Sequence, residues 1–370
     1  MKELAKQWVR YEQWKALYKR YERILIPAIL LFGVAVDFLT FRSINLQTFI
    51  LLLAVYTILA GATIAYMHFY DEKLASPTRG FALRYMRLST PLVLQFLFGA
   101  LLSASLIFYW FSGAFSVSWP LLVLVALLMI GNDQWRHIYL RPTVQLGVYF
   151  FTLFSLFTLA LPFFLNSIEP QIFFLSGFLS LALAGAYLRG LSSIIKRIDN
   201  IRRRIMTVFL AIFLSMNALY ILNVIPPIPL SLREAGTYHR ITRMGDSYTV
   251  LTEKTSWLEN ILPGTTLHLE RNDPAYVFSA IFAPTELRTR IVHVWQYYDP
   301  SKRAWIEKDA LSFSVVGGRD AGYRGYSMKS ALAPGKWRVD VQTPAGQTLG
   351  RVRFDVETVS ELPKLVEIKQ

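Results

Sequence analysis

The sequence predicts a membrane all-α bundle of about seven transmembrane helices, followed by an all-β immunoglobulin-like sandwich domain. Three observations predict this fold class. Apolar runs approaching the roughly 20 residues that cross a bilayer fill residues 24–225. Positive charges crowd every second connection between these runs. Beyond residue 231, short alternating strands between turn residues replace the long apolar runs.

The candidate spans are runs with few or no charged residues. They lie at 24–41, 47–69, 91–111, 117–131, 144–165, 171–189 and 205–225. The fourth is the weakest, because its clean stretch extends only from Pro120 to Gly131. No cleavage site for a signal peptide follows the first run, so we expect this run to remain as a membrane helix.

Lysine and arginine divide the connections into two classes. They are frequent in residues 1–23 and after the second, fourth and sixth spans, whereas Arg42 is the sole positive residue in the other three connections. Positively charged connections stay in the cytoplasm. The N-terminus is therefore expected in the cytoplasm, and an odd number of spans puts the β domain outside, which is the periplasm for a bacterial inner membrane.

The net charge of +14 belongs mostly to the membrane part. Up to Ser231 the chain carries 20 Lys and Arg against 9 Asp and Glu, and the remainder carries 19 against 16. Because the excess lies between apolar runs, it is typical of charges that set topology rather than of a nucleic-acid surface. We expect no nucleic acid as a partner.

Two basic segments predict contact with anionic lipids at the cytoplasmic face. In the first, aromatic and apolar residues recur at helical spacing, which fits a helix on the leaflet or an extension of the first span. In the second, isoleucines alternate with the basic cluster around Arg203. The two sets are Leu4, Trp8, Tyr11, Trp14, Tyr18 and Tyr21, and Ile194, Ile195, Ile198, Ile201 and Ile205.

Three prolines in Ile225–Pro229 predict the end of the last helix and an extended, semi-rigid linker over residues 226–231. The domain at 232–370 then contains eight or nine strands, which favours a sandwich. The candidate strands are 238–243, 247–252, 265–270, 276–282, 291–298, 311–316, 325–330, 336–343 and 348–356.

Several segments of residues 276–356 resemble the bacterial family called domain of unknown function 2914. These are Phe282-Ala283-Pro284, the strand 291–295, the turn 317–325, the strand 335–341 and the closing stretch 349–354. The membrane part also resembles multi-pass members of this family, at Asp37, Arg42 and the Pro91…Phe98-Gly99 helix. The resemblance implies this architecture and a bacterial envelope setting. It implies no activity and no catalytic residues.

Asp37 lies in an apolar run, five residues before Arg42. An intramembrane carboxylate is costly and usually has a partner or a purpose. Asp37 is interpreted as a proton or ion site, as a structural pair with Arg42, or as a side chain that reaches the outer lipid headgroups. The loop 131–137, with Asp133 and His137, fits acid–base chemistry or the caps and charges of a helix end.

Two regions of the β domain are candidate ligand sites. His293 and Trp295 alternate along one strand and predict either a ligand surface or an ordinary polar face. Arginines in a glycine-rich connection suit an acidic ligand, or lock the turn through an Arg–Asp pair. The residues of this connection are Arg319, Asp320, Tyr323 and Arg324.

The absence of cysteine excludes disulfides, thiolate metal sites and cysteine nucleophiles. His239, His268 and His293 are far apart in sequence, so we expect no metal and no cofactor. With no catalytic motif, the sequence favours a non-enzymatic membrane protein whose β domain binds an envelope protein or glycan. Two alternatives stay open: an enzyme or transporter for a lipid-linked or small substrate, and a sensor acting through a cytoplasmic partner.

Overall fold

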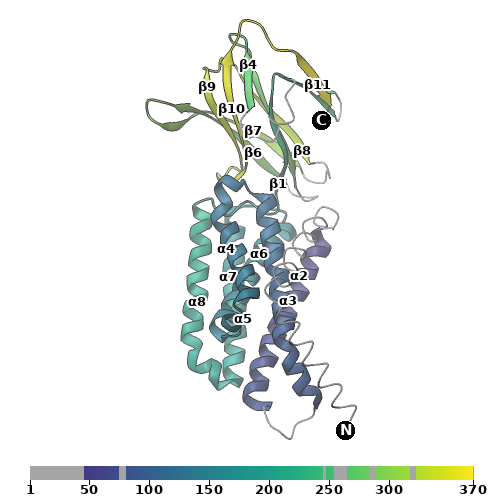
Figure 1. Cartoon of the computed structure of the whole chain (residues 1–370), viewed down its shortest axis with the longest axis vertical. Helices are drawn as coiled ribbons and strands as arrows, with labels where there is room; N and C mark the ends of the chain where they lie inside the picture. Colours follow the sequence, from purple (N-terminus) through teal and green to yellow (C-terminus); the bar gives the residue numbers. More distant parts are fainter. Residues whose placement is uncertain are drawn as a thin grey trace, which may run out of the picture. The chain divides into compact units, whose positions relative to one another are not determined.

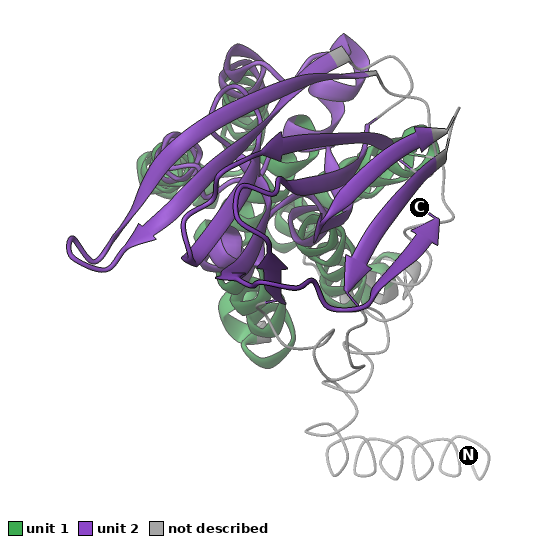
Figure 2. Ribbon diagram, turned by 90° about the horizontal axis from the view of Figure 1, so that it is seen from above, with its two compact units in different colours: residues 1–107, 123–157, 177–214 green, residues 108–122, 158–176, 215–370 purple. Residues whose placement is uncertain are grey.

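The computed structural model describes residues 46–74, 81–244, 247–253, 265–283, 288–316 and 322–369. Along these residues, helices come first and strands follow (Figure 1). Contacts divide the chain into two compact units (Figure 2). Unit 1 comprises residues 1–107, 123–157 and 177–214, and unit 2 comprises residues 108–122, 158–176 and 215–370. The predicted span 24–41, with Asp37 and Arg42, lies outside the described residues.

Six helices of the described chain are long and apolar enough to cross a membrane, which is consistent with a multi-pass membrane protein. The helices are α2 (Leu46–Phe69), α3 (Phe81–Ser112), α4 (Phe115–Gln134), the short α5 (Arg136–Tyr139), α6 (Pro142–Leu165), α7 (Pro170–Ile194) and α8 (Lys196–Ile221). A π-helical turn, η1 (Tyr70–Leu74), continues α2. The predicted fourth span becomes α4, which begins earlier because the N–H groups of Val117 and Ser118 donate to the Ala114 carbonyl.

Small residues and aromatic rings set the helix packing in unit 1. The Tyr187 hydroxyl of α7 donates to the Gly61 carbonyl of α2 over 2.6 Å. Phe150 of α6 and Phe209 of α8 are fully buried, with ring centroids 4.9 Å apart. A Cβ atom at Gly177 would lie 2.8 Å from the Phe154 ring. Close helix contact through small residues is the usual way for membrane helices to associate.

Eleven strands of the described residues form three sheets. The strands are β1 (Ser231–Tyr238), β2 (Arg240–Met244), β3 (Ser247–Glu253), β4 (Thr265–Leu269), β5 (Ala275–Phe282), β6 (Arg288–Asp299), β7 (Ala304–Val316), β8 (Tyr323–Lys329), β9 (Gly335–Gln342), β10 (Thr348–Thr358) and β11 (Leu365–Lys369). The sheet orders are β1-β5-β8, β4-β10-β9-β6-β7 and β11-β3-β2. Strands β4 and β10 are parallel, and the other pairs are antiparallel.

The core of the β domain lies on both faces of β5. On one face, Val277 packs with Trp295, Trp337 and Phe354 from the five-stranded sheet. On the other face, Phe278 packs with Val250 and other residues of the β2–β3 hairpin. Sheet β1-β5-β8 is therefore the middle layer, and β5 reads as a nearly continuous apolar run because both of its faces are covered.

Strands β1 and β11 are absent from the sequence-based prediction. β1 carries Arg233, Glu234 and Gly236, which interrupt the apolar alternation, yet it pairs along its length with β5. β11 is almost entirely exposed and pairs with β3. Neither strand has the half-buried pattern by which a strand is recognised in a sequence.

The proline linker differs from the predicted extended spacer. Residues 225–230 are all buried, and they form turns in which the N–H of Ile228 donates to the Pro226 carbonyl and that of Leu230 to the Pro227 carbonyl. Leu230 joins the core next to Ile281 and Val341. Burial of its apolar side chains therefore outweighs the preference of prolines for an exposed, extended chain.

Candidate functional site

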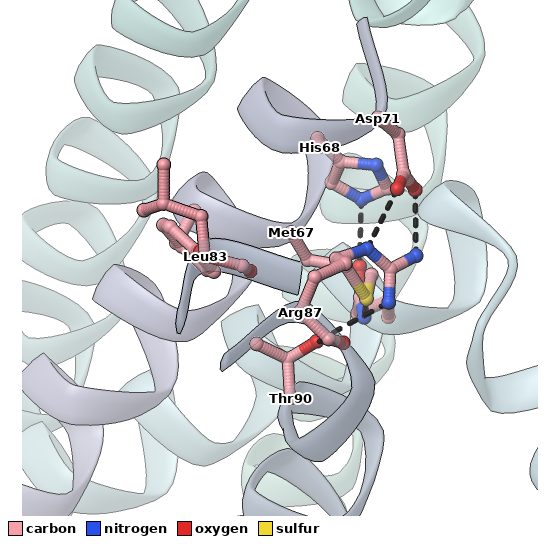
Figure 3. Close-up of polar contacts among 8 residues, drawn as sticks. Met67, His68, Asp71, Leu83, Arg87 and Thr90 are labelled. Carbon is pink, nitrogen blue, oxygen red and sulfur yellow. Dashed lines mark hydrogen bonds and ion pairs between the residues drawn. The ribbon is translucent and has the colours of Figure 1, made fainter. Parts of the chain in front are cut away.

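A polar cluster joins η1, α2, α3 and α6 in unit 1 (Figure 3). The Arg87 guanidinium donates to both carboxylate oxygens of Asp71, over 2.6 and 2.7 Å. His68 is buried, and its Nε2 lies 2.8 Å from Oε1 of the equally buried Gln145. A bidentate Arg–carboxylate pair is a strong and directional contact. The cluster can hold three helices in register.

Glu72 caps the beginning of α8. Its carboxylate oxygens accept the backbone N–H groups of Lys196 and Arg197, over 2.8 and 3.0 Å. The first N–H groups of a helix have no partner within the helix, and a carboxylate also interacts favourably with the helix dipole there. The first turn of α8 is therefore occupied by a side chain of the protein itself.

We expect Glu72→Ala to lower the thermal unfolding midpoint of the full chain in detergent by more than Glu72→Gln does. Alanine removes both acceptors, whereas glutamine keeps one oxygen for an N–H of α8. Circular dichroism at 222 nm measures the midpoints of the two variants. Equal losses would mean that the cap does not hold the end of α8.

The predicted acid–base loop 131–137 makes structural contacts in its first half. Asp133 Oδ1 accepts the Gln95 side-chain amide over 3.0 Å, and the Asn132 amide donates to the Gln95 carbonyl over 2.8 Å. His137 is exposed. No contact within the described chain joins Asp133 to His137, so the acid–base role stays a prediction.

His293 and Trp295 lie in the interior of the β domain rather than on its surface. His293 is fully buried, with Nε2 2.9 Å from Ser279 Oγ and Nδ1 2.8 Å from Ser327 Oγ. The Trp295 indole N–H donates to Ser327 Oγ over 3.0 Å. Burial lowers the pKa of His293 to about 4. This imidazole is neutral near pH 7 and serves as a hydrogen-bonding link between two sheets.

The glycine-rich connection is described only in part. Arg319 and Asp320 lie outside the described residues. Tyr323 packs against the core, and the Arg324 carbonyl accepts the Tyr248 hydroxyl over 3.4 Å. A ligand-binding role for these residues stays a prediction.

The structure brings together two histidines that are 29 positions apart in the sequence. Glu253 Oε1 lies 2.9 Å from His239 Nε2, and Oε2 lies 2.7 Å from His268 Nδ1. Burial alone would raise the pKa of Glu253, but hydrogen bonds from His268 and His239 lower it below its ordinary value. This cluster ties the β2–β3 hairpin to β4. Among the described residues, no group of three or more His, Asp or Glu side chains is arranged for a metal ion.

A basic and aromatic surface lies on the side of the five-stranded sheet that faces away from the core. We call it the arginine–tryptophan face, and it consists of Gln296, Trp305, Arg338, Asp340, Arg351 and Arg353. The Arg338 guanidinium lies 4.5 Å above the centre of the Trp305 ring, and its Nε donates to Gln296 Oε1. Burial, followed by the charge of Arg351, lowers the pKa of Arg338.

Charges on this face are unevenly balanced. Arg351 makes a bidentate pair with the buried Asp340, over 2.5 and 2.7 Å. Arg338 and Arg353 occupy directly opposite positions of β9 and β10. No carboxylate of a described residue pairs with either arginine. The face can therefore receive an anion between two guanidinium groups.

This face is not predicted by the sequence analysis, although the alternation of charged and apolar residues in β9 and β10 indicates part of it. Arg338 and Asp340 alternate with Trp337, Val339 and Val341, so they belong to the uncovered side of a strand. Arg351 and Arg353 alternate in the same way with apolar residues. What the pattern lacks is the register that sets Arg338 opposite Arg353.

The β9–β10 turn contacts helix ends within unit 2. The Gln347 side chain is buried, and its amide donates to the Ile225 carbonyl over 3.5 Å. The Ala114 N–H, between α3 and α4, donates to the Thr348 carbonyl over 3.3 Å. Pro226 and Phe173 line a small pocket together with Gln347. These contacts hold the hairpin that bears the arginines against the ends of α3 and α8.

No curated protein sequence matches the chain. Among solved structures, a beta-glucosidase from Listeria innocua in complex with isofagomine is 15% identical, with a TM-score of 0.19, and the match covers 32% of this chain and 17% of the glucosidase. The Pseudomonas fluorescens alkylpurine DNA glycosylase AlkC, bound to DNA containing an abasic site analog, is 11% identical, with a TM-score of 0.23 over 83% of this chain and 99% of that one. Neither likeness carries an argument about fold or function.

A family model matches the region that holds the arginine–tryptophan face. This region runs from the start of β6 to Val356 of β10. The match agrees with the resemblance seen in the sequence, and it assigns no activity. Residues 288–356 thus match the model of DUF2914, a protein family of unknown function.

Proposed function

We propose that this chain is a non-enzymatic protein of the bacterial inner membrane, whose helices present a periplasmic β domain that binds an envelope protein or glycan. The observation that carries the proposal is the attachment of the β9–β10 turn to the helix ends by Gln347 and Thr348. A domain held in this way is presented close to the membrane rather than on a free tether. The basic cytoplasmic segments would contact anionic lipids in the opposite leaflet.

The strand order supports an immunoglobulin-like sandwich for this domain. In that fold, strands A, B, E and D form one sheet and strands C, F and G form the other. A buried tryptophan lies on strand C, the first strand of the second sheet. Here β5 and β8 lie in one sheet, β10-β9-β6 in the other, and Trp295 of β6 is fully buried between them. Such sandwiches commonly serve as binding modules, although fold alone assigns no ligand.

The proposal is tested with the full chain in nanodiscs, incubated separately with protein and glycan fractions of a bacterial envelope. Nanodiscs that carry residues 1–230 serve as the control. We expect a defined envelope component to be retained by the full chain and not by the control. Retention by neither, or turnover of a small substrate by the helical part alone, would contradict the proposal and favour the enzyme or transporter alternative.

The contact between the turn and the helices also leads to a prediction about local stability. We expect Gln347→Ala to increase hydrogen exchange in peptides covering residues 343–349 roughly fivefold, because the loss of one hydrogen bond costs about 1 kcal/mol. Mass spectrometry of the full chain measures this change. Gln342→Ala on the preceding strand is the matched control, and an equal increase there would mean that Gln347 has no special role.

A sensor function is a second candidate, and the same attachment favours it. β9 and β10 carry arginines of the arginine–tryptophan face, and the turn between these two strands contacts the helix ends. Ligand binding would act on the helices only if it changed the position of this hairpin, and a cytoplasmic partner would then have to receive the signal.

A further inference from the structure

We propose that the arginine–tryptophan face binds the carboxylate of an acidic sugar residue in an envelope polysaccharide. This inference rests on the proposed binding function and names its site and ligand class. Arg338 and Arg353 receive the anionic group, and the aromatic rings beside Arg338 receive the sugar ring.

The first argument is the unfavourable placement of two like charges. Directly opposite residues on antiparallel strands have Cβ atoms about 5 Å apart, and like charges at such positions destabilise a sheet. Arg338 and Arg353 occupy such a pair. The nearby carboxylate of Asp340 is already paired with Arg351. An anion between the two guanidinium groups would remove the repulsion.

The second argument is that Arg338 is held in place before any ligand arrives. Its guanidinium is fixed by the Trp305 ring on one side and by the Gln296 side chain through Nε. Its two terminal nitrogens have no carboxylate partner among the described residues. An arginine fixed in this way loses little side-chain entropy when its terminal nitrogens bind a planar, bidentate carboxylate.

The third argument concerns the rest of the ligand. Tyr298 and Trp305 lie side by side on β6 and β7, with ring centroids 5.3 Å apart, and both are half-buried. These rings extend the face beyond Arg338 with apolar surface that still reaches solvent. A ring-shaped ligand that bears a carboxylate matches both chemistries, whereas a free inorganic anion would use the arginines alone.

The test uses the full chain in nanodiscs of phosphatidylcholine, which carry no net charge. The probe is an oligomer of galacturonic acid, and its methyl ester is the matched uncharged ligand. We expect the acid to bind and the ester not to bind, with affinity falling as sodium chloride is raised. Equal binding of acid and ester would overturn the proposal. Binding of inorganic phosphate, or of phosphatidylglycerol nanodiscs added as a competitor, without binding of the oligomer would also overturn the proposal.

Arg353→Ala is the decisive variant, because Arg353 is exposed and makes no ion pair with a described residue. We expect it to bind the oligomer roughly tenfold more weakly, since a hydrogen bond to a charged group is lost. We also expect its thermal midpoint to equal or exceed that of the unmodified chain, because the repulsion with Arg338 disappears. A merely structural arginine would lower the midpoint and leave binding unchanged, and that result would overturn the proposal.

Two further variants complete the design. Arg338→Lys keeps the charge but loses the planar fork, so we expect weaker binding in a folded chain. Arg240→Ala, on the exposed surface of β2 in a different sheet, removes the same charge and should leave binding unchanged. If envelope glycan is retained by the full chain regardless of Arg353, this inference fails while the proposed binding function stands. If nothing is retained, both fail.

Discussion

Alanine at position 325 is expected to destabilise the β domain by about 3 kcal/mol, because overpacking of a tight core contact costs roughly this much. A Cβ atom built on Gly325 would lie 2.2 Å from Cε2 of Phe313, and two further ring atoms would lie within 2.6 Å. The Phe313 ring cannot move away freely, since it packs edge-on against His293 at 5.0 Å. The small residue on β8 is therefore required by a neighbouring ring rather than by its backbone angles.

Chemical denaturation of the full chain in detergent, followed by tryptophan fluorescence, measures this loss. The matched control is the double variant Gly325→Ala with Phe313→Ala, in which the clash is absent. We expect the two changes to be strongly non-additive, because residues in direct contact couple in a double-mutant cycle. Additive losses would show that Gly325 and Phe313 do not compete for the same space.

The stability of the β domain is expected to fall by roughly 3 kcal/mol as the pH decreases from 6.5 towards 4, through His293 alone. Its pKa is lowered from 6.5 to about 4 by burial. The unfolded chain therefore takes up a proton at a higher pH than the folded chain does. The stabilisation that His293 contributes is fully present above pH 6.5 and is lost as the pH falls from 6.5 towards 4.

Denaturation midpoints at a series of pH values, for the unmodified chain and for His293→Gln, separate this effect from that of other groups. Glutamine can still hydrogen-bond to Ser279 and Ser327 but does not titrate. We expect the variant to be less stable at pH 7 and to lose less stability on acidification. Parallel pH profiles for the two chains would mean that His293 is not the group responsible.

Much of the architecture can be predicted from local patterns. The apolar runs at 47–69 and 144–165 correspond closely to α2 and α6, because a membrane helix needs a continuous apolar stretch of a set length. The alternation of Trp337, Val339 and Val341 predicts β9, because one side of that strand faces the core. Patterns of this kind report burial, and burial is largely a property of each segment taken by itself.

The sites are less accessible to such reasoning. His293 reads as part of a polar strand face, yet the middle sheet covers it, and two serines from β5 and β8 satisfy its nitrogens. His239 and His268 read as isolated, yet both contact Glu253. The surroundings of each histidine depend on which strands become neighbours, and no single segment of the sequence specifies that pairing.

The amino-acid sequence by itself determined the helical membrane part, its apolar spans and the succession of strands after Ser231, because hydropathy and alternation act locally along the chain. Only the tertiary structure decided that Arg338 lies opposite Arg353, that Gln347 contacts Ile225, and that β5 is covered on both faces. These features arise from register and layer packing between distant segments. The physical reason is that a strand's hydrogen bonds can be satisfied by many partners, and the choice among them is made by the packing of the whole domain.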